Sequence, residues 1–592
     1  MRGINNLFIQ LLALLATYSF AFAQDTYYVN LSKDSTHFIR VTIVPEKLSS
    51  ENNVYQFAST APGTYQTMDI GRFVRQFRAF DASGSEITTT HSSLNQWSIS
   101  EPSRVQKIEF AVSTTMETPV DSNVVYPMCG SSLQYDNALL NGQTYVGYFK
   151  GKQYSPVRIK FVYPQDWTAG TALEKDSDGF YRAESFDKVV DSPVLLGNLT
   201  HASMNADGTD VEVYTYSNSG IITSDSMMSF IKDILHAESE FMGGLPVKKY
   251  TFLFHFGKMS YGAWEHSYSS DYTMEDQPLS PGYKDMLRTI VAHEFYHIFT
   301  PLTLHSELIE HFNYEKPVMS QHLWLYEGVT EWAANMMMLR TNMISLDDYL
   351  KRMSEKLAES KSYGANVSLR DLGVNSVRMQ RQYADIYARG AIVAGLLDLR
   401  LLELSKGKRG LREVLHDLSQ EYGINKSFSE ATFFDDFTRM TYPEIKDFFN
   451  RYIIGNEPLP VKEYFSKVGI EYQDFAGYDS SRAYSGLSMM VSDNMIVVSS
   501  IDSGQSGVDI KKGDVVFKVY GDTLTLQNAM QKTAVLRKLQ VGDELQLTLL
   551  RDKMPHDVTL KMLPVKRNFI FKEDPMASPE ELSLREAWMS LK

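Results

Sequence analysis

Residues 289–299 read Thr289-Ile290-Val291-Ala292-His293-Glu294-Phe295-Tyr296-His297-Ile298-Phe299, an apolar run that two histidines and one glutamate interrupt at H-E-x-x-H spacing. Side chains four residues apart lie on one face of an α-helix, so His293 and His297 can offer imidazole nitrogens to one metal ion. Glu294 is rotated by about 100° from His293, which suits a group that contacts water on the metal rather than the metal itself. The spacing therefore predicts a zinc-binding helix of a hydrolase.

A third ligand is required, because a short motif also arises by chance and a catalytic zinc ion needs three protein ligands and an open position for water. The stretch Trp324-Leu325-Tyr326-Glu327-Gly328-Val329-Thr330 is amphipathic and begins some thirty residues after the first motif. A W-x-x-E-G-x-T element at this distance resembles that of the gluzincin metallopeptidases, which take their third zinc ligand from its glutamate. The resemblance implies one catalytic zinc ion on His293, His297 and Glu327.

Three further residues are expected to act beside the zinc ion, two in catalysis and one in orienting a ligand. Glu294 is expected to take a proton from water and to deliver it to the leaving amine. Tyr387, in Tyr387-Ala388-Arg389-Gly390 before an apolar helix, resembles the gluzincin tyrosine that hydrogen-bonds the oxyanion, although most of the 34 tyrosines are expected to be structural. Glu331 follows Glu327 by one helical turn and is placed to accept the second N–H of a ligand histidine.

The segment Gly262-Ala263-Trp264-Glu265-His266 follows a predicted strand at Tyr250–Phe256. In gluzincin aminopeptidases the corresponding G-x-M-E-N-like segment is an edge strand that lines the cleft, and its glutamate holds the α-ammonium group of the substrate. Glu265 matches that glutamate, with Trp264 in place of methionine and His266 in place of asparagine. The alternative is a turn with an exposed glutamate. The substrate-binding residues that the resemblance implies are Gly262, Ala263, Trp264 and Glu265.

The first 199 residues are expected to contain a signal peptide and a β-domain. Alternating apolar and polar residues between residues 24 and 199, as in Phe38–Val44, predict strands, and clusters of Gly, Asn, Asp and Ser predict turns between them. An N-terminal β-sandwich is the simplest arrangement. Ala61-Pro62-Gly63-Thr64-Tyr65 followed by Asp69 resembles the P-G-x-Y-x-x-x-D signature of the glycyl aminopeptidase branch of the gluzincins. By itself this motif contains the residues of a turn, and it predicts no catalytic role.

A thermolysin-like catalytic domain is implied for residues 200–472, with an α/β part to about residue 310 and a helical part after it. Short strands then follow in residues 473–566, where Lys512-Gly513-Asp514 and Val541-Gly542-Asp543 resemble a bacterial PDZ domain. Ser485-Gly486-Leu487 stands where the carboxylate-binding loop of such a domain would lie. PDZ domains bind a C-terminal peptide as an added strand; a regulatory or packing role within the chain is the alternative. Residues 567–592 are expected to be a C-terminal tail.

Composition supports this multidomain α+β organisation. A chain of 592 residues is too long for one hydrophobic core, and 43% hydrophobic with 12% aromatic residues indicates a globular protein. The formal net charge of −14 at pH 7 argues against nucleic acids and anionic membranes as partners. Cys129 is the only cysteine, so no intramolecular disulfide is expected, and without an evident partner it is predicted to be a small buried hydrophobe.

Residues 1–23 have the pattern of a signal peptide. Met1-Arg2 is positively charged, Leu7–Phe22 is mostly apolar, and Ala21-Phe22-Ala23 is a cleavage signal. The apolar run is shorter than the roughly 20 residues of a membrane span, which favours cleavage over an uncleaved anchor. Gln24, and not a cysteine, comes directly after the cleavage site, so no lipid anchor is expected. The mature chain is therefore expected to begin at Gln24, to be periplasmic or secreted, and to lack a membrane span.

These features predict an exported zinc metallopeptidase that resembles the glycyl aminopeptidase family. The resemblance implies that it removes small N-terminal residues, Gly or Ala, from peptide or protein substrates. One departure from the family is Ile298-Phe299-Thr300-Pro301, which replaces a usual Trp-Asn and basic run, so contacts to the substrate are expected to differ. Two alternatives stay open. One is a zinc endopeptidase with PDZ-guided substrate binding, distinguished by whether Glu265 closes the cleft; the other is a non-catalytic peptide-binding protein on the same fold.

Overall fold

The computed structural model describes residues 24–31, 37–258, 262–364, 366–492, 495–526 and 528–591. The predicted signal peptide, residues 1–23, lies outside the described residues. Among the described residues, no helix is both long enough and apolar enough to cross a membrane. The chain divides into two compact units: the first comprises Met1–Tyr349, Glu359–Pro460 and Pro579–Lys592, and the second comprises Leu350–Ala358 and Val461–Ser578.

The N-terminal part of the first unit is built from strands, as the alternating pattern predicts. Along β2, the side chains of Ile39, Val41 and Ile43 are buried and their neighbours are exposed or half-buried, because successive side chains of a strand point to opposite faces. The strands are β1 (Asp25–Asn30), β2 (Phe38–Val44), β3 (Val54–Gln56), β4 (Val74–Phe80), β5 (Glu86–Ile87), β6 (Thr89–Ser93), β7 (Gln96–Ile99), β8 (Lys107–Ser113), β9 (Ser132–Leu133), β10 (Asn137–Leu140), β11 (Tyr148–Phe149), β12 (Val157–Val162), β13 (Thr168–Thr171), β14 (Glu174–Lys175), β15 (Tyr181–Ala183) and β16 (Val194–Gly197), with the short helix α2 (Phe186–Val190) before β16.

These strands form three sheets, where a simple sandwich has two. An eight-stranded sheet has the order β14-β15-β12-β1-β2-β8-β4-β5, and two four-stranded sheets have the orders β13-β16-β10-β9 and β11-β3-β7-β6. Buried side chains from all three sheets belong to one hydrophobic cluster. The two smaller sheets are built from short strands, β9, β10, β13 and β16 in one and β3, β6, β7 and β11 in the other. The domain is therefore β-rich with one core, as expected, but its layers are subdivided.

The part of the first unit in which the sequence predicts a catalytic domain is built on a five-stranded sheet of order β17-β18-β19-β21-β20. Its strands are β17 (Thr200–Ala206), β18 (Thr209–Ser217), β19 (Lys249–Gly257), β20 (Gly262–His266) and β21 (Ser269–Glu275). Strands β18, β19 and β21 run parallel, whereas β20 pairs antiparallel with β21 and forms an edge of the sheet. The sequence motif around Glu265 thus lies on an edge strand.

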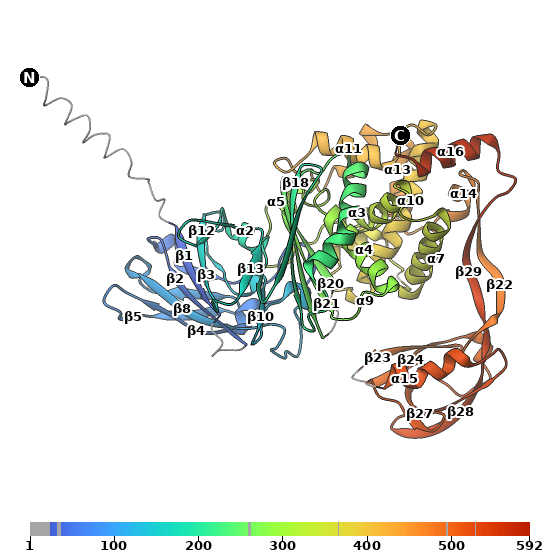
Figure 1. The fold of residues 1–592 in the computed structure, drawn as a ribbon, viewed down its shortest axis with the longest axis horizontal. Helices are drawn as coiled ribbons and strands as arrows, with labels where there is room; N and C mark the ends of the chain where they lie inside the picture. Colours follow the sequence, from blue (N-terminus) through green and yellow to red (C-terminus); the bar gives the residue numbers. More distant parts are fainter. Residues whose placement is uncertain are drawn as a thin grey trace, which may run out of the picture. The chain divides into compact units, whose positions relative to one another are not determined.

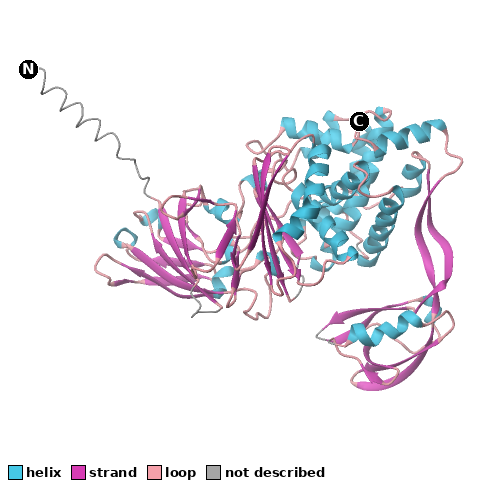
Figure 2. Ribbon diagram, in the orientation of Figure 1, coloured by secondary structure: helices cyan, strands magenta, loops and turns pink. Residues whose placement is uncertain are grey.

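Helices cover one face of this sheet in Figure 2, and the N-terminal strands contact its other face through β13 and β16. Figure 1 shows α3 and α4 next to the sheet, where α3 contacts β17 and α4 contacts β20. The helices of the first unit and the α7 helix that joins both units are α3 (Ser224–Met242), α4 (Pro281–Tyr296), α5 (Glu307–Glu310), α6 (Thr330–Arg340), α7 (Leu346–Tyr363), α8 (Leu369–Val374), α9 (Gln380–Tyr383), α10 (Asp385–Ser405), α11 (Leu411–Glu421), α12 (Phe433–Met440), α13 (Glu444–Tyr452) and α16 (Pro579–Met589).

Local sequence signals set the ends of α3. Its first turn is capped by Thr223, whose side chain accepts a hydrogen bond from the Ser226 backbone N–H. The helix ends at Gly243, which adopts the left-handed conformation with φ of 78°. These two signals account for the bounds of α3 at Ser224–Met242.

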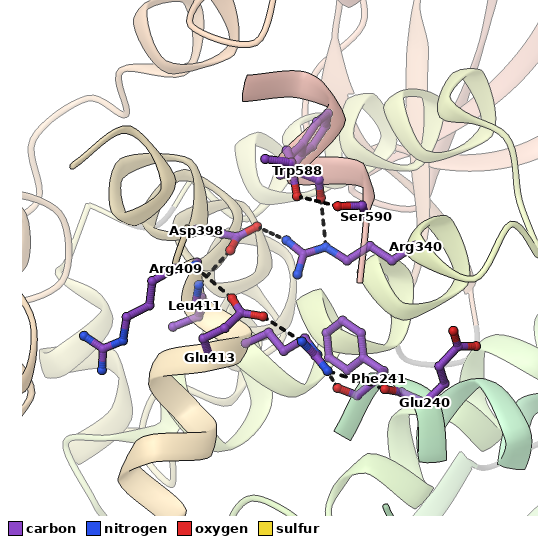
Figure 3. A network of polar contacts seen from close by, with 12 residues as sticks. Glu240, Phe241, Arg340, Asp398, Arg409, Leu411, Glu413, Trp588 and Ser590 are labelled. Carbon is purple, nitrogen blue, oxygen red and sulfur yellow. Dashed lines mark hydrogen bonds and ion pairs between the residues drawn. The ribbon is translucent and has the colours of Figure 1, made fainter. Parts of the chain in front are cut away.

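The C-terminal helix α16 belongs to the first unit, although the second unit precedes it in the sequence. Arg340 donates from Nε to the carbonyl of Trp588 and from Nη2 to Asp398, both at 2.8 Å (Figure 3). The Trp588 side chain is buried and packs edge-on against Tyr349. Residues 567–592, expected to be a tail, instead comprise the end of a strand and this anchored helix. The difference arises because one buried tryptophan and one buried arginine fix a segment that is otherwise rich in charged residues.

The second unit contains the region that resembles a PDZ domain. Strands β22 (Ile470–Tyr484) and β29 (Leu563–Glu573) form a two-stranded ribbon. A further sheet has the order β23-β24-β25-β27-β28, with β26 paired to β25. The unit begins at Val461, ahead of the expected boundary at residue 473, because β22 already pairs with β29 from Ile470 onward. Its other elements are α14 (Val461–Ser466), β23 (Leu487–Ser492), β24 (Met495–Ile501), β25 (Val515–Val519), β26 (Asp522–Thr523), α15 (Ala529–Thr533), β27 (Glu544–Arg551) and β28 (Met554–Lys561).

Candidate metal centre and active site

Helix α4 brings the two histidines of the first motif together. The helix begins after Ser280, whose hydroxyl accepts a hydrogen bond from the Tyr283 backbone N–H, and Pro281 occupies its first turn. His293 lies in its last turn and His297 directly follows it in a helical conformation. The centroids of the two imidazole rings are 4.8 Å apart, and both side chains are buried. The four-residue spacing therefore places both rings at one point.

Glu327 reaches the same point from a π-helical turn, η7 (Trp324–Val329), that continues into α6. Its Oε2 atom lies 3.4 Å from Nε2 of His293 and 3.6 Å from Nε2 of His297. The turn packs so closely on α10 that a Cβ atom on Gly328 would lie 2.6 Å from the Cα atom of Gly390. Glycine at both positions thus allows η7 and α10 to approach, and π-helical turns are frequent at functional sites.

Both histidines are oriented through their other ring nitrogen. The Nδ1–H group of His293 donates to Glu331 at 2.9 Å, and that of His297 donates to the carbonyl of Thr300 at 2.9 Å. Hydrogen bonds at Nδ1 leave Nε2 of each ring as the metal-binding atom. Glu331 thus lies where the sequence places a residue that orients a ligand histidine.

The donor set fits zinc. Zinc bonds of about 2.0–2.1 Å in tetrahedral geometry separate neighbouring ligand atoms by about 3.4 Å, close to the observed separations of 3.4 and 3.6 Å. Two imidazoles and one carboxylate are ligands that zinc accepts in catalytic sites. His293, His297 and Glu327 can therefore hold the ion and leave a fourth position for water.

Two carboxylates flank the three ligands. Ligand atoms of Glu265, Glu294 and His297 lie within 4.8 Å of one another. Burial raises the pKa of Glu294, and it raises the pKa of Glu265 well above the usual range of a carboxyl group. A carboxylate with a raised pKa is a stronger proton acceptor than an exposed one. Glu294 thus has the position and the basicity of a general base.

Tyr387 lies beside the metal ligands together with a second tyrosine. The ring centroid of Tyr387 is 5.6 Å from that of His293, and its hydroxyl is 2.8 Å from the hydroxyl of Tyr383. Burial raises the pKa of both phenols well above 10, so both keep their protons and can donate hydrogen bonds. The sequence analysis did not identify Tyr383. The available signal was its position one helical turn before Tyr387, at the end of α9.

A third tyrosine comes from the N-terminal domain. The hydroxyl of Tyr65 donates to Oε1 of Glu327 at 2.9 Å. The P-G-x-Y motif that contains Tyr65 was expected to be a turn without a catalytic role. Its contact with Glu327 joins residues 262 positions apart in the sequence, so no local spacing could have identified it.

A cavity of about 240 Å³ lies over the candidate metal centre. Strand β20 contributes Ala263, Trp264 and Glu265 to its wall, whereas Gly262 lies at the start of the strand near Met128. The Trp264 side chain is buried and belongs to the core of the N-terminal domain. The other residues that line the cavity are Gly63, Thr64, Tyr126, Met128, Cys129, Thr289, Ile290, His293, Glu294, His297, Glu327, Glu331, Tyr383 and Tyr387. Cys129 is buried, as expected, and burial raises the pKa of its thiol.

The sequence matches two models of one peptidase family. The Peptidase M61 N-terminal domain matches residues 26–198, and the M61 glycyl aminopeptidase matches residues 286–393, which include the three ligands, Glu294 and Tyr387. The chain thus contains the N-terminal domain and the glycyl aminopeptidase domain of the M61 peptidases. This M61 peptidase is accordingly a zinc metallopeptidase, a hydrolase of peptide bonds.

Two solved structures are similar to this chain to different extents. An aminopeptidase N family protein from Idiomarina loihiensis superposes on this M61 peptidase with a TM-score of 0.78 and 18% identity, over 96% of this chain and 100% of the other. An M1 zinc metallopeptidase from Deinococcus radiodurans gives a TM-score of 0.47 and 11% identity, over 74% of this chain and 94% of the other. No curated protein matches the sequence. The first superposition covers both units and shows a shared multidomain α+β fold.

Proposed function

We propose that this M61 peptidase is an aminopeptidase that holds one zinc ion on His293, His297 and Glu327 and removes single residues from free N-termini. The observation that carries the proposal is the position of Glu265 on edge strand β20, with a carboxylate oxygen within 4.8 Å of ligand atoms of Glu294 and His297. A carboxylate there binds the α-ammonium group of a substrate while the first peptide bond reaches the metal. An amine anchor this close to the metal leaves room for one residue only.

Each catalytic residue has a task that its geometry supports. A bound zinc ion lowers the pKa of water and polarises the scissile carbonyl. Glu294 accepts a proton from the attacking water and later delivers it to the leaving amine. Tyr387, hydrogen-bonded to Tyr383, donates to the oxyanion that develops on the carbonyl oxygen. The high pKa of both phenols keeps these donors protonated.

The space beside the amine anchor supports a preference for small first residues. A Cβ atom on Gly63 would lie 2.4 Å from Oε1 of Glu265 and 2.8 Å from Nε1 of Trp264, so this loop closes against the anchor. The buried Trp264 indole fills one side of the same wall. Glycine and alanine fit next to such a wall without displacing it. A family named for glycyl aminopeptidases agrees with this preference.

The amine anchor gives a direct prediction for Glu265→Gln. One peptide is assayed with a free and with an acetylated N-terminus, and wild type is expected to cleave only the free form efficiently. A charge-assisted bond to the ammonium group contributes about 1.5–3 kcal/mol, so kcat/KM for the free peptide should fall about 10- to 100-fold in the variant. Glu275→Gln is the matched control, because Glu275 ends β21 in the same sheet and its side chain is exposed.

An endopeptidase would behave differently in the same assay. If acetylation leaves the rate of wild type unchanged, or if Glu265→Gln still selects the free amine, Glu265 is not the anchor. The catalytic zinc chemistry would then act on internal peptide bonds.

Export is a second part of the proposal. We infer it from Met1-Arg2, the apolar run Leu7–Phe22 and the cleavage signal before Gln24. N-terminal analysis of the mature protein is expected to find Gln24 as its first residue. Protein that retains residues 1–23 and stays in the cytoplasm would contradict export.

For the second unit we propose C-terminal peptide binding along β23. This strand forms an edge of its sheet, and it follows Ser485-Gly486, where Gly486 has φ of 73°. An edge strand offers the backbone groups that an added peptide strand needs. The full-length protein is expected to bind peptides with a free C-terminal carboxylate and not their amidated forms. Equal binding of both forms would contradict recognition of the C-terminus.

A further inference from the structure

A loop of the N-terminal domain reaches the candidate metal centre and divides the tasks of the two oxygens of Glu327. Oε2 of Glu327 is the atom that faces Nε2 of His293 and Nε2 of His297. Oε1 accepts the hydrogen bond from Tyr65 at 2.9 Å. One oxygen is therefore presented to the metal, and the other is held by a phenol that the catalytic domain does not contain.

The backbone of this loop is strained at Tyr65. Tyr65 has φ of 46°, and Asp69, four residues later, has φ of 50°. A bulky residue in the left-handed region is strained and persists only where the surrounding structure imposes it. The Tyr65 side chain is also nearly fully buried. A turn that only connects two strands has no need of a buried aromatic residue in this conformation.

Hydrogen bonds within the loop hold Tyr65 in place. The Thr60 hydroxyl donates to the Gln66 carbonyl at 2.8 Å, and the Met68 N–H donates to the Ser59 carbonyl at 2.6 Å. The Ser59 hydroxyl donates to Oδ1 of Asp69 at 2.7 Å. These bonds close the loop on both sides of Tyr65, so its hydroxyl has little freedom to leave Glu327.

The same loop touches the amine anchor but does not place Tyr65 in the cavity. Gly63 has φ of 70° and approaches Glu265 so closely that no Cβ atom fits. Gly63 and Thr64 line the cavity, and Tyr65 is not among the described residues that do. Tyr65 therefore acts on the metal ligand and not on the substrate. Three of the four specified residues of the P-G-x-Y-x-x-x-D motif have separate tasks: Gly63 allows close approach, Tyr65 contacts Glu327, and Asp69 closes the loop.

We propose that Tyr65 is a positioning residue that makes Glu327 a ligand through one oxygen, so that the N-terminal domain completes the metal centre. This inference rests on the proposed zinc site. A donor on Oε1 keeps that oxygen from the metal, holds Oε2 toward the two histidines and preserves the open position for water. Hydrogen bonds of this kind to metal ligands typically contribute 10- to 100-fold to metal affinity.

Tyr65→Phe tests the inference through zinc affinity, measured by competition with a chelator. Zinc is expected to bind about 10- to 100-fold more weakly to the variant than to wild type. The rise in Tm that zinc produces should shrink in the same variant, because a ligand stabilises a protein according to its affinity. Tyr145→Phe is the matched control: Tyr145 is buried in the same domain, and its hydroxyl has no hydrogen-bond partner among the described residues.

A second variant, Tyr65→His, distinguishes the hydrogen bond from the packing of the ring. Tyr65→His retains a donor and is expected to recover part of the affinity, which separates the hydrogen bond from a general loss of packing. The inference is overturned if Tyr65→Phe binds zinc as tightly as wild type, or if Tyr145→Phe weakens binding equally. Failure of wild type to bind zinc would instead reject the proposed zinc site. If Tyr65→Phe does not fold without zinc, the release of zinc from the zinc-loaded variant into excess chelator decides: release as slow as from wild type overturns the inference.

Discussion

Replacing Glu294 by glutamine is expected to lower kcat by about 10²–10⁴ while zinc remains bound. The amide has the size of the carboxylate but cannot accept the proton of the attacking water. Metal retention follows because the ligand atoms that meet at the candidate zinc site belong to His293, His297 and Glu327. Turnover of a peptide with a free N-terminus and the zinc content of the same sample are the two measurements.

The pH dependence offers a second readout for Glu294. Burial raises its pKa, and a general base works only when deprotonated, so kcat of wild type should fall as the pH drops through this pKa. The acid limb should disappear from the residual activity of Glu294→Gln. Near-normal turnover in Glu294→Gln would assign the base to another residue. Glu275→Gln again serves as the control for a surface carboxylate.

Tyr387→Phe is expected to lower kcat by about 10²–10³ and to leave KM nearly unchanged. The reason is that a hydrogen bond to the oxyanion forms mainly in the transition state, so its loss does not weaken binding of the substrate. Tyr383 contacts the Tyr387 hydroxyl at 2.8 Å, and Tyr383→Phe should therefore cost less than Tyr387→Phe. Steady-state kinetics of the two variants tests this order.

The opposite order would exchange the roles of the two tyrosines. A larger loss of kcat in Tyr383→Phe would make Tyr383 the donor to the oxyanion and Tyr387 its support. A loss expressed mainly in KM would show that neither phenol acts in the transition state.

Local periodicity was enough to predict the helix that carries the two histidines of the metal centre, whereas Glu327 was identified through the family resemblance. A four-residue spacing on one helix needs no knowledge of the fold, and it places His293 and His297 together. The strand at Tyr250–Phe256 and the helix from Ser224 were also predictable, since alternation and capping residues are local signals. The position of Glu331 next to His293 follows from one further turn of the Glu327 helix.

Contacts between distant segments were not predictable in this way. Tyr65 meets Glu327 only because the N-terminal domain packs on the catalytic domain, and its local motif has the character of a turn. Tyr383 resembles any other tyrosine until Tyr387 is placed beside it. The packing of the C-terminal helix on the first unit was not predictable, because Trp588 accepts its hydrogen bond from Arg340, 248 positions earlier in the sequence.

The match to a peptidase family and the structure bear differently on the two alternatives, a non-catalytic binding protein and an endopeptidase. The match to a peptidase family and the presence of all three ligands, the base and the oxyanion donors in one cavity argue against a non-catalytic binding protein. The choice between aminopeptidase and endopeptidase depends on Glu265 alone, since the zinc chemistry is the same for both. The comparison of free and acetylated peptides therefore settles substrate class without bearing on the metal.

The zinc content of purified wild type and of His293→Ala tests the central claim most directly. We expect one zinc ion per chain in wild type and loss of that ion in His293→Ala, with both proteins folded because the hydrophobic cores do not depend on the metal. His236→Ala is the control, because His236 is exposed and its ring contacts the Asp207 carboxylate at 3.1 Å. One zinc ion in wild type and His236→Ala, and none in His293→Ala, is the predicted result; stoichiometric zinc in His293→Ala would contradict the account.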